Sequence, residues 1–570
     1  MGIFKGIVEC RQLRKGLSLK QKKLNIKISS VNLILLVSLF ITLVSNKVFF
    51  SKATERLGEL SLGSFGFILA VYCIVFLVLV FIQFVLGQKY FLKPVMGILL
   101  ILSAGLSYFM QEIGIIFDVD MVRNIVETIK DNNQQEATEL LSLSLIKHVF
   151  LFGVLPVILL SVVQIRYKTF SKELVIRLLY LLGIIGIVVF LLLANFKFIS
   201  YFARENRDLR VYITPLYAID SIKGYVRSEQ RKNKMPYKII GGDAIQKKTS
   251  KQRTIGIMVV GETARADHFS LNGYQRETNP KLRKESILNY QKVSSCGTST
   301  AYSVPCMFSF LNRDNYSPEK AERQSNVLDV LEKADIEVIW LDNNSSCKGV
   351  CKRTGEINLR QNPDKESAFY SDGEEFDEAL IAKMDEQFKT LQPDKDVLFV
   401  LHTLGSHGPK YYKRYPEAFS QFEPACKHAT PQECTDKEII NAYDNSILYT
   451  DYVLSQLINY LKTQENTQQD GTKNSIESFL IYASDHGESL GEKGVYLHGL
   501  PYFIAPKAQT HIPMMMWLSE AYQSNHALEF NKLKQYENID KISHDNLSHS
   551  LLGAFEVQTE LYKSDYDLLR

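Results

Sequence analysis

Long apolar stretches and short apolar runs divide the chain into two unlike parts. Up to residue 196 the sequence contains five charge-free apolar stretches, each about long enough, at about 1.5 Å per residue, to cross the ~30 Å hydrocarbon core of a bilayer. Because five occur in series, they predict membrane-spanning helices rather than buried helices of a soluble protein. The first is also too long for a cleavable signal peptide, and four more follow it. We expect the spans at about 28–46, 65–87, 94–111, 148–165 and 178–196, in a transmembrane domain over 28–196.

The remainder of the chain has the pattern of a globular domain. Short apolar runs, typical of buried strands, alternate with helical patterns, and this alternation predicts an α/β domain with a largely parallel sheet. We expect a catalytic domain over 251–570, after a linker at 197–250 that forms one or two amphipathic helices along the bilayer surface. The clearest strands lie at 254–260, 337–341, 396–401, 479–483 and 512–517, and helical patterns include 326–333, 376–391 and 437–462.

Lysine and arginine in the short loops predict the orientation, because such residues accumulate on the cytoplasmic side. The tail 1–27 carries eight of them against a single acid, Glu9, which places the N-terminus in the cytoplasm. With five crossings, the C-terminal domain then emerges on the opposite side. The other loops expected inside agree, since they contain Lys89, Lys93, Arg166, Lys168, Lys172 and Arg177.

The loop between the third and fourth spans, at 112–147, is long and mixed in charge. It is amphipathic enough to lie at the bilayer surface. Asn124, Thr128 and Glu136 would be available there for polar contacts.

Cysteine usage gives an independent indication of the compartment. Of eight cysteines, Cys10 and Cys73 fall in the tail and in a span, and the other six form three close sequence pairs in the C-terminal domain. Local disulfides persist only in an oxidising compartment, where the predicted topology places this domain. A zinc-thiolate site is the alternative, but no C-x-x-C pair is present. The spacings of 10, 4 and 8 favour the bridges Cys296–Cys306, Cys347–Cys351 and Cys426–Cys434.

The overall charge excludes one class of partner. The 570 residues include 66 basic and 62 acidic side chains, which leave a formal charge of only +4. A nucleic-acid-binding protein with a broad basic face is therefore not indicated.

Three of the expected strands run into carboxylate and imidazole side chains beside glycines. In open α/β sheets, ligands bind beyond the carboxyl ends of the strands, so these side chains are expected at one edge. Carboxylate plus imidazole is the ligand chemistry of a divalent metal such as zinc, and manganese is less suited to so many histidines. The side chains are Glu262 after the first strand, His402 and His407 after the third, and Asp485 and His486 after the fourth.

A segment dense in hydroxyls, at 294–306, supplies candidate nucleophiles. Ser, Thr and Ala following Gly297 indicate a helix start, where backbone N–H groups and the helix dipole favour a bound phosphate. A metal at the same hydroxyl would lower its pKa and activate it for attack. The residues by themselves do not choose among Thr298, Ser299 and Thr300, and a structural helix cap in a disulfide loop is the alternative.

At these residues the sequence closely resembles the lipid A phosphoethanolamine transferases, including the mobile colistin-resistance enzymes, within the alkaline phosphatase superfamily. The resemblance covers essentially the whole chain and implies five spans followed by a periplasmic α/β/α sulfatase-like domain. It is carried by VVGETARADHFSLNGY from Val259, SCGTSTAYSVPCMFS from Ser295, LHTLGSHGPKYYKRYP from Leu401 and YASDHGESLGEKGVYLHGLP from Tyr482.

The resemblance implies a role for each matching residue. Thr300 would be the nucleophile that carries a phosphoethanolamine intermediate, and Glu262, Asp485 and His486 would bind zinc together with it. His407 and His498 match histidines that hold the phosphoryl group or a second zinc, and either would act as acid or base. The positions matching substrate or lipid recognition are His402, Ser345, Lys348, Asn124, Thr128 and Glu136.

The implied reaction is a ping-pong transfer in the inner membrane of a Gram-negative cell. Phosphatidylethanolamine donates the group, diacylglycerol leaves, and a lipid A phosphate then accepts phosphoethanolamine from the threonine. The resemblance implies that this weakens the binding of polymyxin-like peptides. We expect one firmly bound zinc, room for a second, and a monomer.

Other activities share this chemistry. The acceptor could instead be a Kdo or heptose core sugar, or a periplasmic glucan. A membrane-tethered sulfatase or phosphodiesterase would pass the intermediate to water. A glycerophosphate polymerase of the lipoteichoic acid type also has five spans and a threonine nucleophile, but the three cysteine pairs argue for a Gram-negative periplasm. A catalytically silent receptor is the alternative from a different class.

Overall fold

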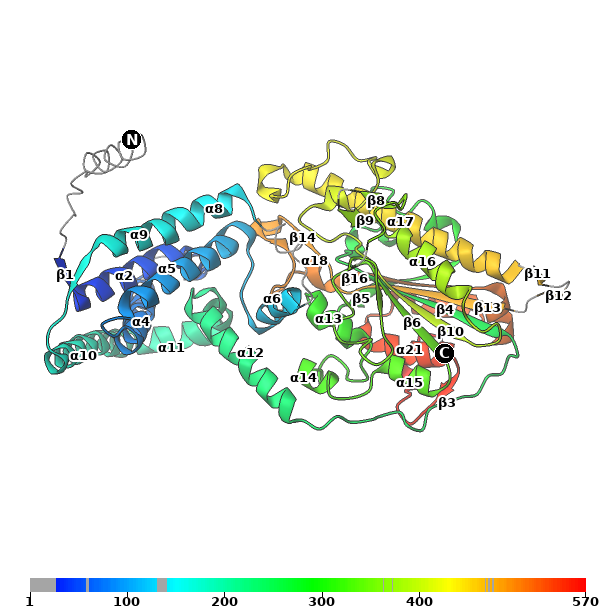
Figure 1. The fold of residues 1–570 in the computed structure, drawn as a ribbon, viewed down its shortest axis with the longest axis horizontal. Coiled ribbons are helices and arrows are strands. Elements are labelled where there is room, and N and C mark those ends of the chain that lie inside the picture. The colour runs from blue at the N-terminus through cyan, green and yellow to red at the C-terminus, as the bar shows by residue number, and fades with distance from the viewer. Residues whose placement is uncertain are drawn as a thin grey trace, which may run out of the picture. The chain divides into compact units, whose positions relative to one another are not determined.

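A computed structural model describes residues 27–57, 61–130, 141–361, 363–371, 373–466, 468–469, 472–473 and 476–569. Glu136, Cys10 and the tail up to residue 26 lie outside the described residues. The chain forms two compact units (Figure 1). The first combines the segment ending at Gln111 with Leu143–Tyr217, and the second combines Glu112–Ser142 with Ala218–Arg570.

The first unit is a bundle of long apolar helices. Four helices in the described part of the chain are long and apolar enough to cross a membrane: α4 (Leu62–Leu86), the continuous segments Leu92–Ile113 and Leu143–Val162, and α10 (Phe170–Ala194). A fifth crossing requires α2 (Ser30–Ser45) and α3 (Lys47–Leu57) to count as one span bent by 58°.

The first expected span, at 28–46, corresponds to α2, and a bend that the sequence pattern did not indicate follows it. α2 has 16 residues and ends at Ser45, and Asn46 after it has a non-helical backbone conformation. The Asn46 side chain donates to the Thr214 carbonyl at 2.8 Å and accepts from the Thr214 N–H at 2.9 Å. This paired amide contact holds the break in place, and the sequence pattern gave no sign of it.

The basic segments expected on one side of the membrane meet at one end of this bundle. β1 (Lys27–Ser29), before α2, pairs in parallel with β2 (Gln164–Arg166), which follows α9 (Leu155–Val162). Lys93 donates to the carbonyls of Ser161 and Val163, and Arg177 donates to those of Phe84 and Gly87. The chain segments near Lys27, Lys93, Arg166 and Arg177 therefore share one end of the helical unit.

The second unit is built on one large sheet with the strand order β17-β5-β16-β13-β4-β10-β6-β7 in the described residues. All pairings in it are parallel except those of β16 with β13 and with β5. The largely parallel α/β architecture expected from the sequence is thus the observed one. The strands are β4 (Arg253–Gly261), β5 (Ile287–Ser294), β6 (Glu337–Asp342), β7 (Ile357–Asn358), β10 (Val397–His402), β13 (Ile476–Ser484), β16 (His511–Leu518) and β17 (Ile542–Ser543).

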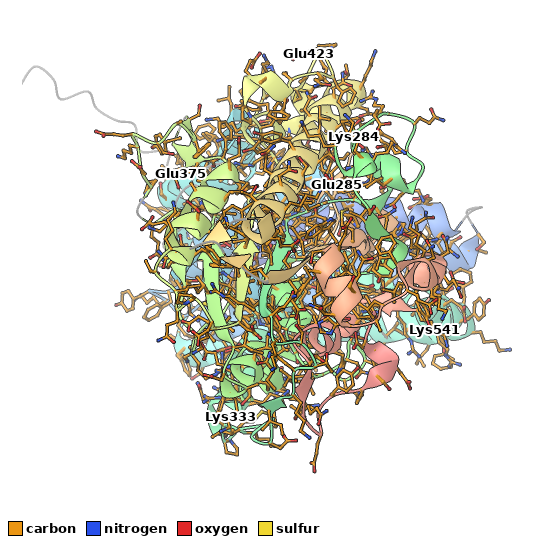
Figure 2. All side chains as sticks on the ribbon, turned by 90° about the vertical axis from the view of Figure 1, so that its right-hand side faces the viewer. Lys284, Glu285, Lys333, Glu375, Glu423 and Lys541 are labelled. Carbon is orange, nitrogen blue, oxygen red and sulfur yellow. A yellow bond between two sulfur atoms is a disulfide. The ribbon has the colours of Figure 1, made fainter. Side chains whose placement is uncertain are left out.

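Helices cover both faces of the sheet, and strand residues alternate between the two resulting cores (Figure 1). In β4, Ile257 and Val259 pack with α16 (Glu378–Phe388) and α17 (Asp436–Asn466), whereas Met258 and Val260 pack with α15 (Val327–Lys333) and α21 (Leu547–Ala554). This alternation follows from the two-residue repeat of a strand. Exposed charges such as Lys333, Glu423 and Lys541 lie at the rim of the unit (Figure 2).

Three disulfides join Cys296 to Cys306, Cys347 to Cys351 and Cys426 to Cys434, which are the pairs that the sequence spacing favoured. Their sulfurs are therefore engaged in disulfides and not in a zinc-thiolate site. Among the described cysteines, Cys73 is free, and it lies in α4.

The loop and the linker expected at the bilayer surface belong, in large part, to the same compact unit as the catalytic domain. α6 (Val119–Lys130) contacts α13 (Thr300–Met307), and its Arg123 is buried beside Asp120 at 2.5 Å. In α12 (Leu216–Lys234), Ser228 donates to Glu319 at 2.6 Å. An amphipathic helix needs a cover for its apolar face, and neighbouring protein provides one as well as lipid does.

Candidate metal and nucleophile site

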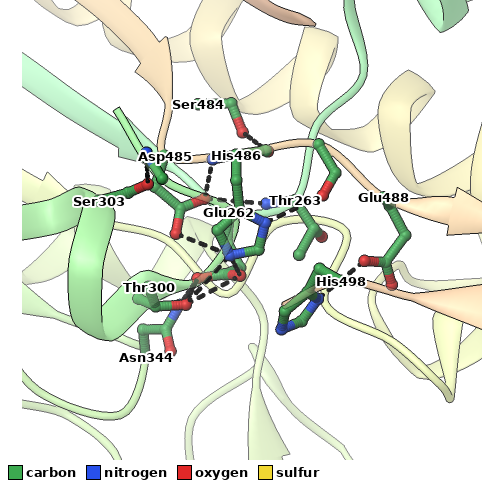
Figure 3. A network of polar contacts seen from close by, with 12 residues as sticks. Glu262, Thr263, Thr300, Ser303, Asn344, Ser484, Asp485, His486, Glu488 and His498 are labelled. Carbon is green, nitrogen blue, oxygen red and sulfur yellow. Dashed lines mark hydrogen bonds and ion pairs between the residues drawn. The ribbon is translucent and has the colours of Figure 1, made fainter. Parts of the chain in front are cut away.

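The centre of the site is built where neighbouring parallel strands end. Ser484 in β13 pairs with Gly261 in β4, so Glu262 and Asp485 leave the sheet side by side. His486 follows directly, and Thr300 begins α13 on the opposite side of the cluster (Figure 3). All four side chains are nearly or completely buried. The edge of the sheet therefore brings together the four residues that the resemblance implied as metal ligands.

The polar atoms of these four residues converge. The Thr300 hydroxyl lies 3.2 and 3.4 Å from the two Glu262 oxygens and 3.4 Å from His486 Nε2. His486 Nε2 is in turn 3.2 Å from Asp485 Oδ2 and 3.6 Å from Glu262 Oε1. Glu262, Asp485 and His486 form a group whose ligand atoms all lie within 4.8 Å of one another.

The hydrogen bonds around the cluster leave electron pairs pointing inward. His486 Nδ1 donates to the Gly487 carbonyl at 2.9 Å, so Nε2 presents its lone pair to the cluster. Asp485 Oδ1 accepts the N–H groups of Thr263 and His486, whereas buried Oδ2 has no hydrogen-bond donor among the described residues. A divalent cation such as zinc fits these ligand atoms, because its positive charge would balance the electron pairs that point into the cluster.

The ionisation of the cluster points the same way. Burial, followed by the charge of Asp485, raises the pKa of Glu262 well above its ordinary value, and burial raises the pKa of Asp485 to about 6. Burial lowers the pKa of His486 well below its ordinary value, which keeps the imidazole neutral. A bound cation would reverse the penalty on both carboxylates.

The structure distinguishes the hydroxyls that the sequence left open. Thr298 donates to the Leu500 carbonyl at 2.7 Å, so its hydroxyl faces the 500 segment. Thr300 is the residue whose hydroxyl contacts Glu262 and His486. Thr300 is therefore the candidate nucleophile that the geometry favours.

Asn344 belongs to the site but was missed by sequence reasoning. Its Nδ2 donates to Glu262 Oε2 at 2.8 Å and to the Thr403 carbonyl at 2.9 Å, which fixes the Glu262 carboxylate. The signal was present, since Asn344 follows the strand β6 just as the expected ligands follow theirs. It was overlooked because an amide is a poor ligand for zinc.

The three other expected histidines lie near the cluster in different settings. The rings of His407 and His498 are 5.6 Å apart, and the ring of His498 is 4.4 Å from that of His486. Burial, followed by His498, lowers the pKa of His407 well below its ordinary value. His402 is fully buried, and its Nδ1 bonds Asp342 at 2.8 Å.

The residues expected to recognise the substrate lie on two other segments, the loop after β6 and the helix α6. Ser345 and Lys348 follow Asn344 in the loop after β6, where Lys348 is buried with a left-handed backbone. Asn124 and Thr128 are half-buried on α6, the helix that contacts the nucleophile's helix α13. Glu136 lies outside the described residues.

His544 joins the nucleophile loop to the metal-ligand loop and makes stability depend on pH. The Cys296 N–H donates to its Nδ1, and its Nε2 donates to the Ser484 carbonyl. Burial lowers the pKa of His544 to about 4. This neutral form therefore adds stability that is complete above the unfolded pKa of about 6.5 and is lost as the pH falls toward 4, up to about 3 kcal/mol.

We expect the stability advantage of the wild type over His544→Gln to shrink by about 3 kcal/mol between pH 7 and pH 4. Denaturant titrations followed by tryptophan fluorescence would measure it, because both tryptophans, Trp340 and Trp517, are buried in the catalytic unit. An advantage that stays constant over this pH range would contradict the assignment.

Comparison with known proteins identifies the fold class and then the family. A sulfatase family model matches residues 255–557, and a model for the phosphoethanolamine transferases EptA/EptB matches residues 73–230. The chain is thus a membrane protein with a sulfatase-like domain of the alkaline phosphatase superfamily. It belongs to the family of phosphoethanolamine transferases and is an enzyme of that class.

The similarity extends over nearly the whole length of the relatives. The chain is 36% identical to the phosphoethanolamine transferase EptA of Escherichia coli K12, with 96% of this chain and 98% of that protein covered. It is 34% identical to the phosphatidylethanolamine transferase Mcr-1 of Escherichia coli, with 95% and 98% covered. Its structure is similar to that of the integral membrane lipooligosaccharide phosphoethanolamine transferase A of Neisseria meningitidis, with a TM-score of 0.88, 34% identity, and 95% and 99% covered.

Proposed function

We propose that this enzyme transfers phosphoethanolamine from phosphatidylethanolamine to a lipid A phosphate through a covalent ester on Thr300. The observation that carries the proposal is the convergence of the Thr300 hydroxyl with Glu262, Asp485 and His486. Membership of the phosphoethanolamine transferase family supports the transferred group. The name of the Neisseria relative supports an acceptor in lipooligosaccharide.

The proposed cofactor is zinc, held by Glu262, Thr300, Asp485 and His486. When bound, zinc would make the Thr300 oxygen more nucleophilic and would stabilise negative charge on the phosphoryl group. Asn344 would hold the Glu262 carboxylate in place, and the Gly487 carbonyl would fix the tautomer of His486.

Thr300 would attack phosphorus as the bond to the diacylglycerol oxygen breaks. One proton must pass from the Thr300 hydroxyl to that oxygen, and one of the two neighbouring histidines, His407 or His498, would move it. In the second half-reaction an acceptor phosphate oxygen attacks the threonine ester, and Thr300 regains a proton. Buried Lys348 would balance phosphate charge, while His402, Ser345, Asn124 and Thr128 would contribute to substrate recognition.

The proposed location is the inner membrane of a Gram-negative cell, with the N-terminus in the cytoplasm and the catalytic unit in the periplasm. The basic segments at one end of the helical unit support this orientation, because positive residues favour the cytoplasmic side. The disulfides of the catalytic unit support an oxidising compartment. The added ethanolamine would reduce the negative charge of lipid A and the binding of polymyxin-like cationic peptides.

Mass spectrometry of lipopolysaccharide from a polymyxin-sensitive host expressing the chain would test this function. We expect lipid A that carries added phosphoethanolamine, and lipid A unchanged from the empty host when Thr300→Ala is expressed. Phosphoethanolamine on Kdo or heptose, with unmodified lipid A, would contradict the proposed acceptor but agree with the proposed transfer reaction. Free phosphoethanolamine without any modified acceptor would instead indicate a hydrolase.

A further inference from the structure

A buried carboxylate that has no part in the proposed metal site lies against His498. Glu488 is fully buried, and its Oε2 accepts a hydrogen bond from His498 Nδ1 at 2.8 Å (Figure 3). This bond holds His498 through Nδ1, so Nε2 lies on the side of the ring that is turned away from Glu488. The His498 ring is 4.4 Å from the His486 ring, beside the proposed metal site.

A short hairpin brings the two residues together. β14 (Ser489–Leu490) pairs in antiparallel fashion with β15 (Tyr496–Leu497), and Ser489 is opposite Leu497. Glu488 and His498 are the next residues along the two strands, so the register places them across from each other. The contact is therefore a direct product of the backbone geometry.

The second carboxylate oxygen is held as firmly as the first. Tyr411 is buried and its hydroxyl donates to Glu488 Oε1 at 2.7 Å. Burial, followed by the Glu488 charge, raises the pKa of Tyr411 well above its ordinary value, so the phenol stays a donor. The carboxylate thus has one fixed orientation, with one oxygen on Tyr411 and the other on His498.

Residue 408 must be small to leave room for this arrangement. A Cβ added at Gly408 would lie 2.7 Å from Glu488 Oε1 and 2.8 Å from the Tyr411 hydroxyl, closer than real contacts allow. Gly408 directly follows His407. The segment that carries one site histidine therefore also accommodates the carboxylate that holds the other.

We propose that Glu488 is a positioning residue, which holds His498 through Nδ1 in the orientation that lets Nε2 pass a proton to the diacylglycerol leaving group. The inference rests on the proposed function and deepens it by choosing His498 over His407 for this step. As the Thr300 oxygen–phosphorus bond forms and the phosphorus–diacylglycerol bond breaks, His498 Nε2 takes the proton that leaves Thr300 and passes it to the departing oxygen. The proton lost by Thr300 balances the one gained by diacylglycerol. The hydrogen bond to Glu488 fixes the side of the ring from which the proton is passed on.

The test compares leaving groups that do and do not need a proton. In detergent-solubilised full-length enzyme without acceptor, Glu488→Gln should slow single-turnover release of diacylglycerol from phosphatidylethanolamine by about 100-fold. The KM for this lipid should change little, because the ground-state contacts remain. With the nitrophenyl ester of phosphoethanolamine, whose leaving group departs as a stable anion, the loss should be less than about 5-fold.

Two controls make the comparison specific. Glu492→Gln makes the same change in the same hairpin, at a carboxylate that pairs with Arg265, and should leave both rates near the wild type. His498→Gln should lose about as much as Glu488→Gln, and the double variant should lose no more than either alone.

The outcomes separate this inference from the proposed function. An equal loss with both esters would mean that Glu488 only supports the fold, and would overturn the inference. A Glu488→Gln rate near the wild type for diacylglycerol would overturn it as well. If the wild type releases no diacylglycerol in a Thr300-dependent manner, the proposed function itself fails.

Discussion

Replacing Thr300 by alanine should lower phosphoethanolamine transfer by about 10⁴-fold or more, the largest effect we expect of any single substitution. The hydroxyl of Thr300 lies in the converging cluster with Glu262 and His486, and alanine removes the oxygen that would carry the proposed ester. The remaining groups would then have no covalent route from donor to acceptor. Transfer from a fluorescent phosphatidylethanolamine in detergent would measure the loss.

Thr298 offers a matched control two residues away. Its hydroxyl donates to the Leu500 carbonyl, so Thr298→Ala removes one hydrogen bond worth about 1 kcal/mol of stability and no reacting atom. Thr300→Ser should retain far more activity than Thr300→Ala, because it keeps the oxygen. Comparable activity in Thr300→Ala and the wild type would exclude the covalent route.

Asp485→Asn should lower transfer by about 10³-fold and remove most of the bound metal. The amide oxygen can still accept the N–H groups of Thr263 and His486, so the backbone around residue 485 is retained. The group that replaces Oδ2 is either a neutral oxygen or an N–H donor, and neither compensates a cation. The variant should therefore fold normally but lose most of its bound metal, and with it most of its transfer activity.

Elemental analysis alongside the activity assay would check this prediction. We expect about one zinc per wild-type chain and much less in Asp485→Asn. Asp267→Asn is the matched control, since Asp267 pairs with Arg265 outside the cluster and should keep its metal. A chelator should reduce the wild type to the level of the variant, and added zinc should restore the wild type alone. Full zinc content in Asp485→Asn would remove this residue from the ligand set.

Much of the catalytic site could be anticipated because it follows from the sheet. Neighbouring parallel strands end at one edge, so ligand-type residues after β4 and β13 had to lie close together. Asn344 was missed for a chemical reason, since amides were not counted as ligands. The strand β5 was missed because the polar residues Asn289, Gln291 and Lys292 interrupt its apolar pattern.

Other features depend on contacts that no sequence pattern reveals. The choice of Thr300 over Thr298 required the position of the Leu500 carbonyl. The contact of Glu488 with His498 depends on the register of two strands of two residues each, which are too short to leave a periodic signal. In the helical unit, the bend between α2 and α3 lies at Asn46, which contacts Thr214 far along the chain.

The most direct test of the account is to trap the intermediate. The full-length enzyme, loaded with zinc and given phosphatidylethanolamine without acceptor, would be digested and mapped by mass spectrometry. We predict one phosphoethanolamine group on the peptide that contains Thr300, located on that residue by fragmentation and lost when lipid A is added. A modification on another residue, or an unmodified enzyme that still transfers the group, would contradict the account.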